Sequence, residues 1–276
     1  MDVRVTGPGP VAPFLRARDL FETALTLERP VTIDVVADPG ERTRVTHTAD
    51  SHRMTISRHA ASSTMARDLT LHEFAHMYRT ERDHPSHTQS TEEALLLGLA
   101  GHSVEQRKLT HCYQIANHMK DIYADDLWLE FAPTAGLVAL LETSLATALA
   151  DRPQTAQAGV FGSEEPGGPV GSEVEGPAEA RQGVLASRLT AGADADMTAV
   201  NAAFALALVE RHDLVDPEHR LYDLAHAASV DAPHIDIETF REQFRSLPTN
   251  PDESEYRQAL VDVTRAYAGG RGPAAD

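Results

Sequence analysis

The pattern of apolar and polar positions changes character near Ser57. Before it, short β-branched runs are separated by turn residues such as Pro39–Glu41, which is typical of a small antiparallel sheet. Ahead of these runs, Phe14–Leu27 has apolar residues at helical spacing and predicts a helix. The predicted strands are Pro30–Asp38, Arg44–Ala49 and Arg53–Ser57.

After Ser57 the apolar residues recur with the helical period. Asp216 and Asn250, each followed by proline, predict the starts of two late helices. We therefore expect an α+β fold with a mainly helical C-terminal part. The other predicted helices are Ser62–Thr80 with Ser62 or Ser63 as N-cap, a stretch over Thr91–Phe131 broken near Gly98–Gly101, Ala132–Ala150, and Met197–His212.

Glycine, proline and glutamate crowd the segment Asp151–Gly183, which has almost no apolar side chains to bury. Such a composition is typical of a flexible linker or insertion. The expected organisation is a core over 1–150, a linker over 151–183, a helical bundle over 184–268 and a disordered tail over 269–276.

Acidic residues outnumber basic ones, so the formal net charge is −18, and Lys108 and Lys120 are the only lysines. This composition resembles that of proteins from salt-loving archaea, in which surface carboxylates hold water while salt screens their repulsion. It offers no basic stripe for phosphates, which argues against nucleic-acid binding.

Cys112 is the only cysteine, so we expect no disulfide framework and a cytoplasmic location. The apolar segment Ala132–Ala150 includes Glu142, so we expect a buried helix and no membrane insertion.

The stretch LTLHEFAHMYRTE, Leu69–Glu81, contains an HExxH motif. On a helix, residues four apart lie on one face, so His72 and His76 can both direct a ring nitrogen at one metal ion. Glu73 lies beside that face, where it can hold and deprotonate a water whose pKa Zn²⁺ has lowered. The motif therefore predicts a zinc site with Glu73 as the general base of a hydrolysis.

HExxH preceded by a strand resembles the zincin metallopeptidases. Residues 53–130 resemble an uncharacterised family of haloarchaeal HExxH proteins related to small gluzincin-like peptidases. The metzincin pattern fails, because Arg79 and Arg82 stand where its glycine and third histidine belong. The resemblance implies a zincin-like fold, in which an active-site helix and a ligand helix follow the sheet. It also implies an activity, that of a cytoplasmic metalloendopeptidase acting on peptides or proteins. It also implies that a sheet edge holds the substrate by strand addition. We expect this edge to be formed by Arg53, Met54, Thr55, Ile56 and Ser57.

A catalytic zinc usually has three protein ligands. One face of the helical stretch Tyr113–Glu130 collects Asn117, Asp121 and Asp125 at four-residue spacing. The sequence NHMKDIYAD resembles the NxxxD and ExxAD elements of two HExxH groups, with aspartate in place of the glutamate of ExxAD. Both registers imply Asp121 as the third ligand, with Asp125 or Asn117 orienting a ligand histidine.

Other third ligands stay open at this point. Glu105 lies at a spacing from His76 that gluzincin-type enzymes accommodate, and Glu92 and Glu93 lie nearer, at a separation close to that of thermolysin-like enzymes. The pair Glu92–Glu93 also reads as an acidic helix start. His84 and His87 are expected in a polar loop.

Two functions follow from these expectations. In the first, the protein is a zinc hydrolase, most specifically a metalloendopeptidase. In the second, the metal only stabilises the fold, and the helical C-terminal part binds a partner. Retention of Glu73 favours the first, because a purely structural site has no use for a base.

Overall fold

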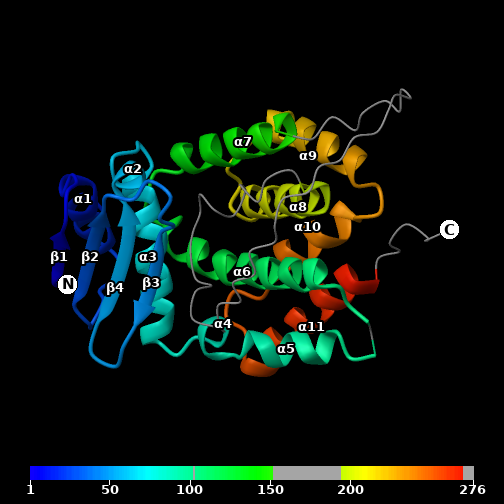
Figure 1. Cartoon of the computed structure of the whole chain (residues 1–276), viewed down its shortest axis with the longest axis horizontal. Helices are drawn as coiled ribbons and strands as arrows, with labels where there is room; N and C mark the ends of the chain where they lie inside the picture. Colours follow the sequence, from blue (N-terminus) through cyan, green and yellow to red (C-terminus); the bar gives the residue numbers. More distant parts are fainter. Residues whose placement is uncertain (102, 152–193, 270–276) are drawn as a thin grey trace, which may run out of the picture.

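The computed structural model describes residues 1–101, 103–151 and 194–269. A mixed four-stranded sheet lies at one end of the molecule and helices fill the rest (Figure 1). The strands are β1 (Val3–Thr6), β2 (Val31–Val36), β3 (Arg44–His47) and β4 (His52–Ser57), in the spatial order β1-β2-β4-β3. β2 pairs in parallel with both β1 and β4, and only β3 and β4 pair antiparallel.

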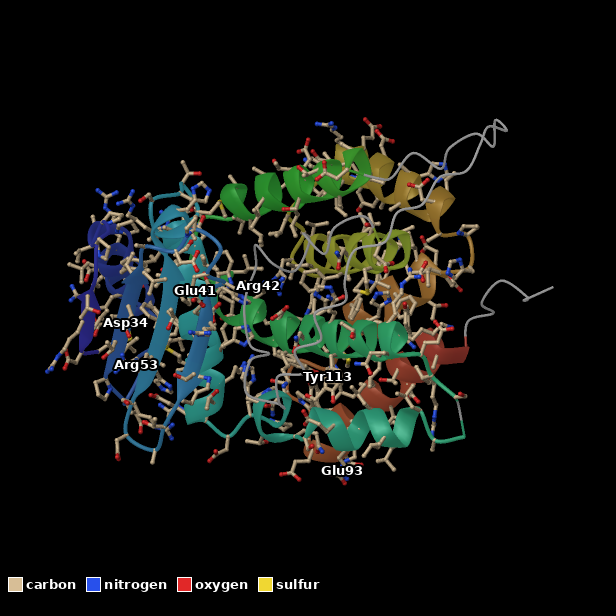
Figure 2. The ribbon with its side chains drawn as sticks, in the orientation of Figure 1. Asp34, Glu41, Arg42, Arg53, Glu93 and Tyr113 are labelled. Carbon is tan, nitrogen blue, oxygen red and sulfur yellow. The ribbon has the colours of Figure 1, made fainter. Side chains whose placement is uncertain are left out.

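The prediction of an antiparallel sheet is therefore wrong, although the α+β class is confirmed. Helix α1 (Ala12–Phe21) crosses between β1 and β2, and such a crossover makes the flanking strands parallel. The loop after β2 leads to β3, which forms the far edge of the sheet. The next strand, β4, therefore lies between β2 and β3. β1 was not predicted. The alternation along β2 buries Val31, Ile33 and Val35, whereas Asp34 lies on the opposite face with Arg53 (Figure 2).

The predicted helices are present with shifted starts. The helix that carries the HExxH motif begins at Ala66, because Ser57 caps a separate short turn ahead of it. His219, and not Asp216, caps the helix that begins at Arg220. Asp252, and not Asn250, begins the last helix through reciprocal hydrogen bonds with Glu255. The helices after α1 are α2 (Arg58–Ala61), α3 (Ala66–Glu81), α4 (Pro85–Thr88), α5 (Thr91–Gly98), α6 (Gln106–Trp128), α7 (Ala135–Ala150), α8 (Ala195–Arg211), α9 (Arg220–Asp231), α10 (Ile237–Arg245) and α11 (Glu253–Gly269).

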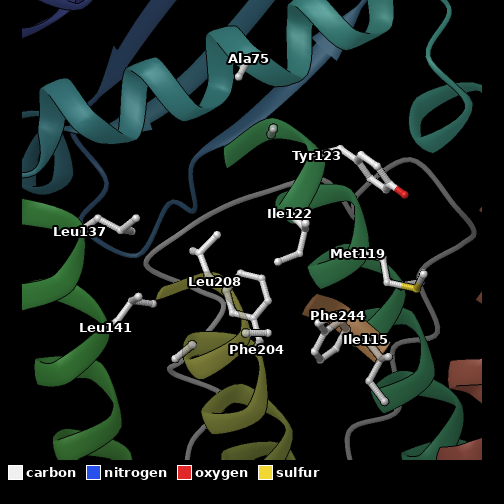
Figure 3. Close-up of a cluster of buried hydrophobic side chains, with 14 of the residues drawn as sticks. Ala75, Ile115, Met119, Ile122, Tyr123, Leu137, Leu141, Phe204, Leu208 and Phe244 are labelled. Atoms are coloured by element: carbon white, nitrogen blue, oxygen red, sulfur yellow. The ribbon is translucent and has the colours of Figure 1, made fainter. Parts of the chain in front are cut away.

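Helix α6 lies at the centre, in contact with α3, α4, α5, α8 and α11. Cys112, Ile115, Met119 and Ile122 of α6 are buried, in one hydrophobic cluster with Phe204 of α8 (Figure 3). Each such fully buried side chain stabilises the fold by about 1.5–3 kcal/mol. The helices of the predicted C-terminal bundle pack on α5, α6 and α7. The central position of α6 fixes its polar side against α3.

Among the described residues, no helix combines the length and apolarity needed to cross a membrane. Except for Asp151, which caps the end of α7, the predicted linker lies outside the described residues. The predicted tail beyond Gly269 lies outside them as well.

Candidate metal centre

Helix α3 brings the two histidines of the motif together, as their spacing predicts. The Nε2 atoms of His72 and His76 lie 2.8 Å apart. His72 is buried, whereas the side chain of His76 keeps 16% of its surface exposed. The two imidazoles therefore present one nitrogen each to a shared point between α3 and α6.

Asp121 of α6 completes the group. Its Oδ1 lies 3.2 Å from Nε2 of His76 and 3.8 Å from Nε2 of His72. Together, the side chains of His72, His76 and Asp121 form a group whose ligand atoms could hold one metal ion. His118, one turn before Asp121, places Nδ1 3.8 Å from its Oδ2. Two imidazoles and a carboxylate are the ligand types that zinc takes in hydrolytic sites, so the donor set fits this metal.

A buried carboxylate orients His72 from behind. Nδ1 of His72 lies 2.7 Å from Oδ1 of Asp125, and the indole Nε1 of Trp128 donates to the same oxygen at 2.8 Å. Because a carboxylate only accepts, the proton of His72 lies on Nδ1 and leaves Nε2 for the metal position. The predicted role of Asp125 thus has the geometry it needs. Asn117 is half-buried one helical turn before Asp121.

His76 has a different kind of partner. Its Nδ1 lies 2.8 Å from Nε2 of His87, whose Nδ1 lies 2.8 Å from the hydroxyl of Ser86. That hydroxyl in turn lies 2.7 Å from Nδ1 of His84. The prediction of a polar loop for His84 and His87 is therefore wrong. Helix α4, which begins with Pro85, brings His87 onto His76, and its N-cap His84 is joined to His87 through Ser86. Sequence reasoning missed this contact because His87 has no fixed spacing from the motif.

For His76, His84 and His87 the surroundings favour the neutral imidazole, which is the form that binds metals. Burial lowers the pKa of His76 and the neighbouring His72 lowers it further, although Asp121 and Glu73 pull it upward. Burial also lowers the pKa of His87 well below its usual value, and brings that of His84 to about 4. Glu73 itself is buried. Its carboxylate raises the pKa of His76, which indicates that it lies near the ligand group.

The alternative third ligands lie elsewhere. Glu105 is exposed and immediately precedes α6, so Asp121 lies about 24 Å further along the helix at 1.5 Å per residue. Glu92 and Glu93 are exposed in the first turn of α5, and Glu93 points away from the molecule (Figure 2). The structure therefore brings Asp121, and none of these glutamates, to His72 and His76.

The prediction that Arg53, Met54, Thr55, Ile56 and Ser57 form a substrate-binding edge is wrong. They belong to β4, an inner strand in which Arg53, Met54 and Thr55 pair with β2 on one side and with β3 on the other, whereas Ile56 and Ser57 pair with β2 and lie beyond the end of β3. Residues paired on both sides have no main-chain groups left for a further strand, so Arg53–Thr55 cannot form the edge. The sheet edges are β1 and β3, and β3 is the edge that ends at His47.

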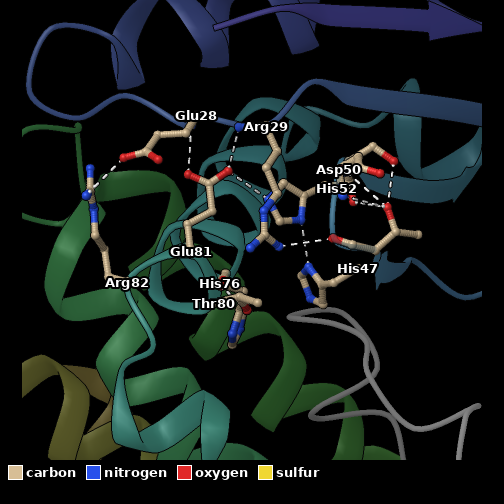
Figure 4. Close-up of polar contacts among 11 residues, drawn as sticks. Glu28, Arg29, His47, Asp50, His52, His76, Thr80, Glu81 and Arg82 are labelled. Carbon is tan, nitrogen blue, oxygen red and sulfur yellow. Dashed lines mark hydrogen bonds and ion pairs between the residues drawn. The ribbon is translucent and has the colours of Figure 1, made fainter.

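Two further histidines, which the sequence did not single out, lie between this edge and α3. Nδ1 of His47 lies 2.8 Å from Nδ1 of His52, and Nε2 of His52 lies 3.0 Å from Oε1 of Glu81 (Figure 4). The carboxylate of Glu81 also accepts the backbone N–H groups of Glu28 and Arg29. His52 is fully buried, so this pair anchors the end of α3 to the sheet.

A second group of possible ligands, His111, Asp194 and Asp196, lies at the start of α8. Arg107 pairs with both carboxylates, at 2.8 Å and 3.7 Å, and Asp194 also caps α8. Both carboxylates therefore already have partners within the chain.

Comparison with known protein families identifies the family of this chain. No curated protein and no solved structure matched the chain. The family model that matches spans residues 1–269. The chain belongs to this family, a family of unknown function designated DUF5781.

Proposed function

We propose that the protein is a zinc-dependent hydrolase, and most specifically a metalloendopeptidase acting on peptides or proteins in a zincin-like arrangement. The observation that carries the proposal is the convergence of His72, His76 and Asp121 at distances of 2.8–3.8 Å, with Glu73 buried beside them. His72, His76 and Asp121 would hold the metal. Bound zinc supplies Lewis-acid activation of water and of a carbonyl oxygen.

The side chains of this chain have separable tasks in that proposal. The carboxylate of Glu73 takes a proton from the attacking water and passes it to the leaving nitrogen. Asp125 holds the Nδ1 proton of His72, and His87 contacts Nδ1 of His76, so both rings keep their orientation. The partial exposure of His76 gives water and substrate an approach from one side.

The alternative is a metal that only stabilises the fold, with the helical C-terminal part binding a partner. The deep burial of His72, Glu73 and Asp121 favours this alternative. It predicts a metal-bound protein without turnover.

Substitution of Glu73 separates the two. We expect Glu73→Gln to retain about one zinc per chain and to lose about 10²–10⁴-fold in peptide hydrolysis, because the amide cannot accept the proton. His76→Ala should lose zinc and activity together. The measurements are elemental analysis and cleavage of a fluorogenic peptide mixture, on protein kept in concentrated potassium chloride.

His226→Ala is the matched control, because this histidine is exposed on α9. It should keep both zinc and activity. Full turnover in Glu73→Gln would refute the mechanism, and a wild type that holds zinc without turnover would favour the structural alternative.

A further inference from the structure

The edge strand β3 ends beside the candidate metal centre, and its last residue carries an imidazole. His47 faces His52 across the antiparallel pair, and the same face carries the buried Val45 and Met54. Side chains alternate along a strand, so His47 points to the inner face, toward α3. Figure 4 draws His47 and His76 on the same side of the His52–Glu81 pair.

The hydrogen bonds fix which nitrogen of His47 carries the proton. Glu81, as a carboxylate that already accepts two backbone N–H groups, accepts from Nε2 of His52. Burial lowers the pKa of His52 even though Glu81 pulls it upward, which favours the neutral ring, and in a neutral ring with its proton on Nε2 the Nδ1 atom is an acceptor. In this tautomer Nδ1 of His47, 2.8 Å away, donates to it, and Nε2 of His47 is left as an acceptor.

That acceptor has no hydrogen-bond partner among the residues that the structure describes, and the His47 ring is only half-buried. It lies within electrostatic reach of His76 and His87. Within the described residues β3 pairs only with β4, so its outer main-chain groups face outward. A chain laid along this edge would pass the imidazole on its way to the metal position.

We propose that His47 is a substrate-contacting residue, whose Nε2 accepts a hydrogen bond from a main-chain N–H of an extended peptide seated on the outer edge of β3. The inference rests on the proposed peptidase function. His52 and Glu81 are positioning residues that hold the ring and its tautomer. The recognised class of ligand is therefore a peptide backbone in extended conformation.

Kinetics test the contact. One lost hydrogen bond of ordinary strength raises KM by up to about tenfold, so we expect His47→Ala to do this while zinc per chain stays at the wild-type value. His47→Gln, which restores an acceptor, should recover part of the loss, and His226→Ala should change nothing. If the wild type cleaves peptides and His47→Ala cleaves them with the same kinetics, this inference is wrong while the proposed function stands. A wild type that binds zinc but cleaves no peptide overturns the proposed function, and this inference with it.

Nuclear magnetic resonance tests the tautomer independently of turnover. In protein labelled with ¹⁵N-histidine, the ring signals lost in His47→Ala belong to His47. We expect them to report a protonated Nδ1 and an unprotonated Nε2, and to shift toward a mixed tautomer in Glu81→Gln. A proton on Nε2 of His47 in the wild type would overturn the proposed contact.

Discussion

Asp125 offers the sharpest test of how the centre is built, because two hydrogen bonds converge on one of its oxygens. Oδ1 accepts hydrogen bonds from His72 at 2.7 Å and from Trp128 at 2.8 Å, and the Asp125 side chain has no exposed surface. Asp125→Asn keeps an oxygen there and removes the charge. Asp125→Ala removes the acceptor and leaves two buried donors unpaired.

The magnitudes follow from these contacts. Loss of the charge behind a ligand histidine weakens metal binding about 10–100-fold, which is about 1.4–2.7 kcal/mol. At saturating zinc this loss lowers the melting temperature by about 3–10 °C relative to the zinc-loaded wild type. In Asp125→Ala, the two unpaired donors add a loss of about 2–6 kcal/mol of stability even without zinc.

The assay is a zinc titration against a competing chelator, together with thermal unfolding with and without zinc. Asp126→Asn is the control, because the neighbouring carboxylate pairs with Arg211 of α8 and with His212, and not with His72 or His76. It should lower stability and leave the zinc affinity unchanged. If Asp125→Asn binds zinc as tightly as Asp126→Asn does, Asp125 does not tune the ligand and the reasoning fails.

Two further predictions concern stability. Burial raises the pKa of Asp126, but hydrogen bonds from His212 and Arg211 outweigh it, so the pKa lies below the usual value of an aspartate. Asp126→Asn, which removes one partner of this buried pair, should therefore cost about 3–5 kcal/mol near neutral pH, and the gap to wild type should narrow as the pH falls below the unfolded-state pKa of the aspartate toward the lower folded-state pKa. Denaturant unfolding of wild type and Asp126→Asn between pH 7 and about 3 checks this, and a gap that stays constant through the acid range contradicts it. A methyl group on Gly98 would meet the Thr264 side chain at 2.8 Å, so Gly98→Ala should cost about 1–3 kcal/mol, whereas Gly269→Ala, with open space, should cost nothing. Equal midpoints for the two alanine variants in denaturant would refute the close packing of α5 on α11.

The local features of the centre follow from sequence because they depend on spacing within one helix. Four residues separate His72 from His76, and any α-helix through them brings the rings to one face. Asp121 and Asp125 repeat the same spacing on α6. The residue types then fix the chemistry of the donor set, since two imidazoles and a carboxylate suit zinc.

Tertiary structure decided what depends on pairing between distant segments. Nothing local distinguishes Arg53–Ser57 as an inner strand, because strand order depends on where the loop after β2 leads. The choice of Asp121 over Glu105 required the packing of α6 against α3. His47, His52 and His87 lie on other segments with no characteristic spacing from the motif, and only the folding of β3, β4 and α4 onto α3 brings them to it.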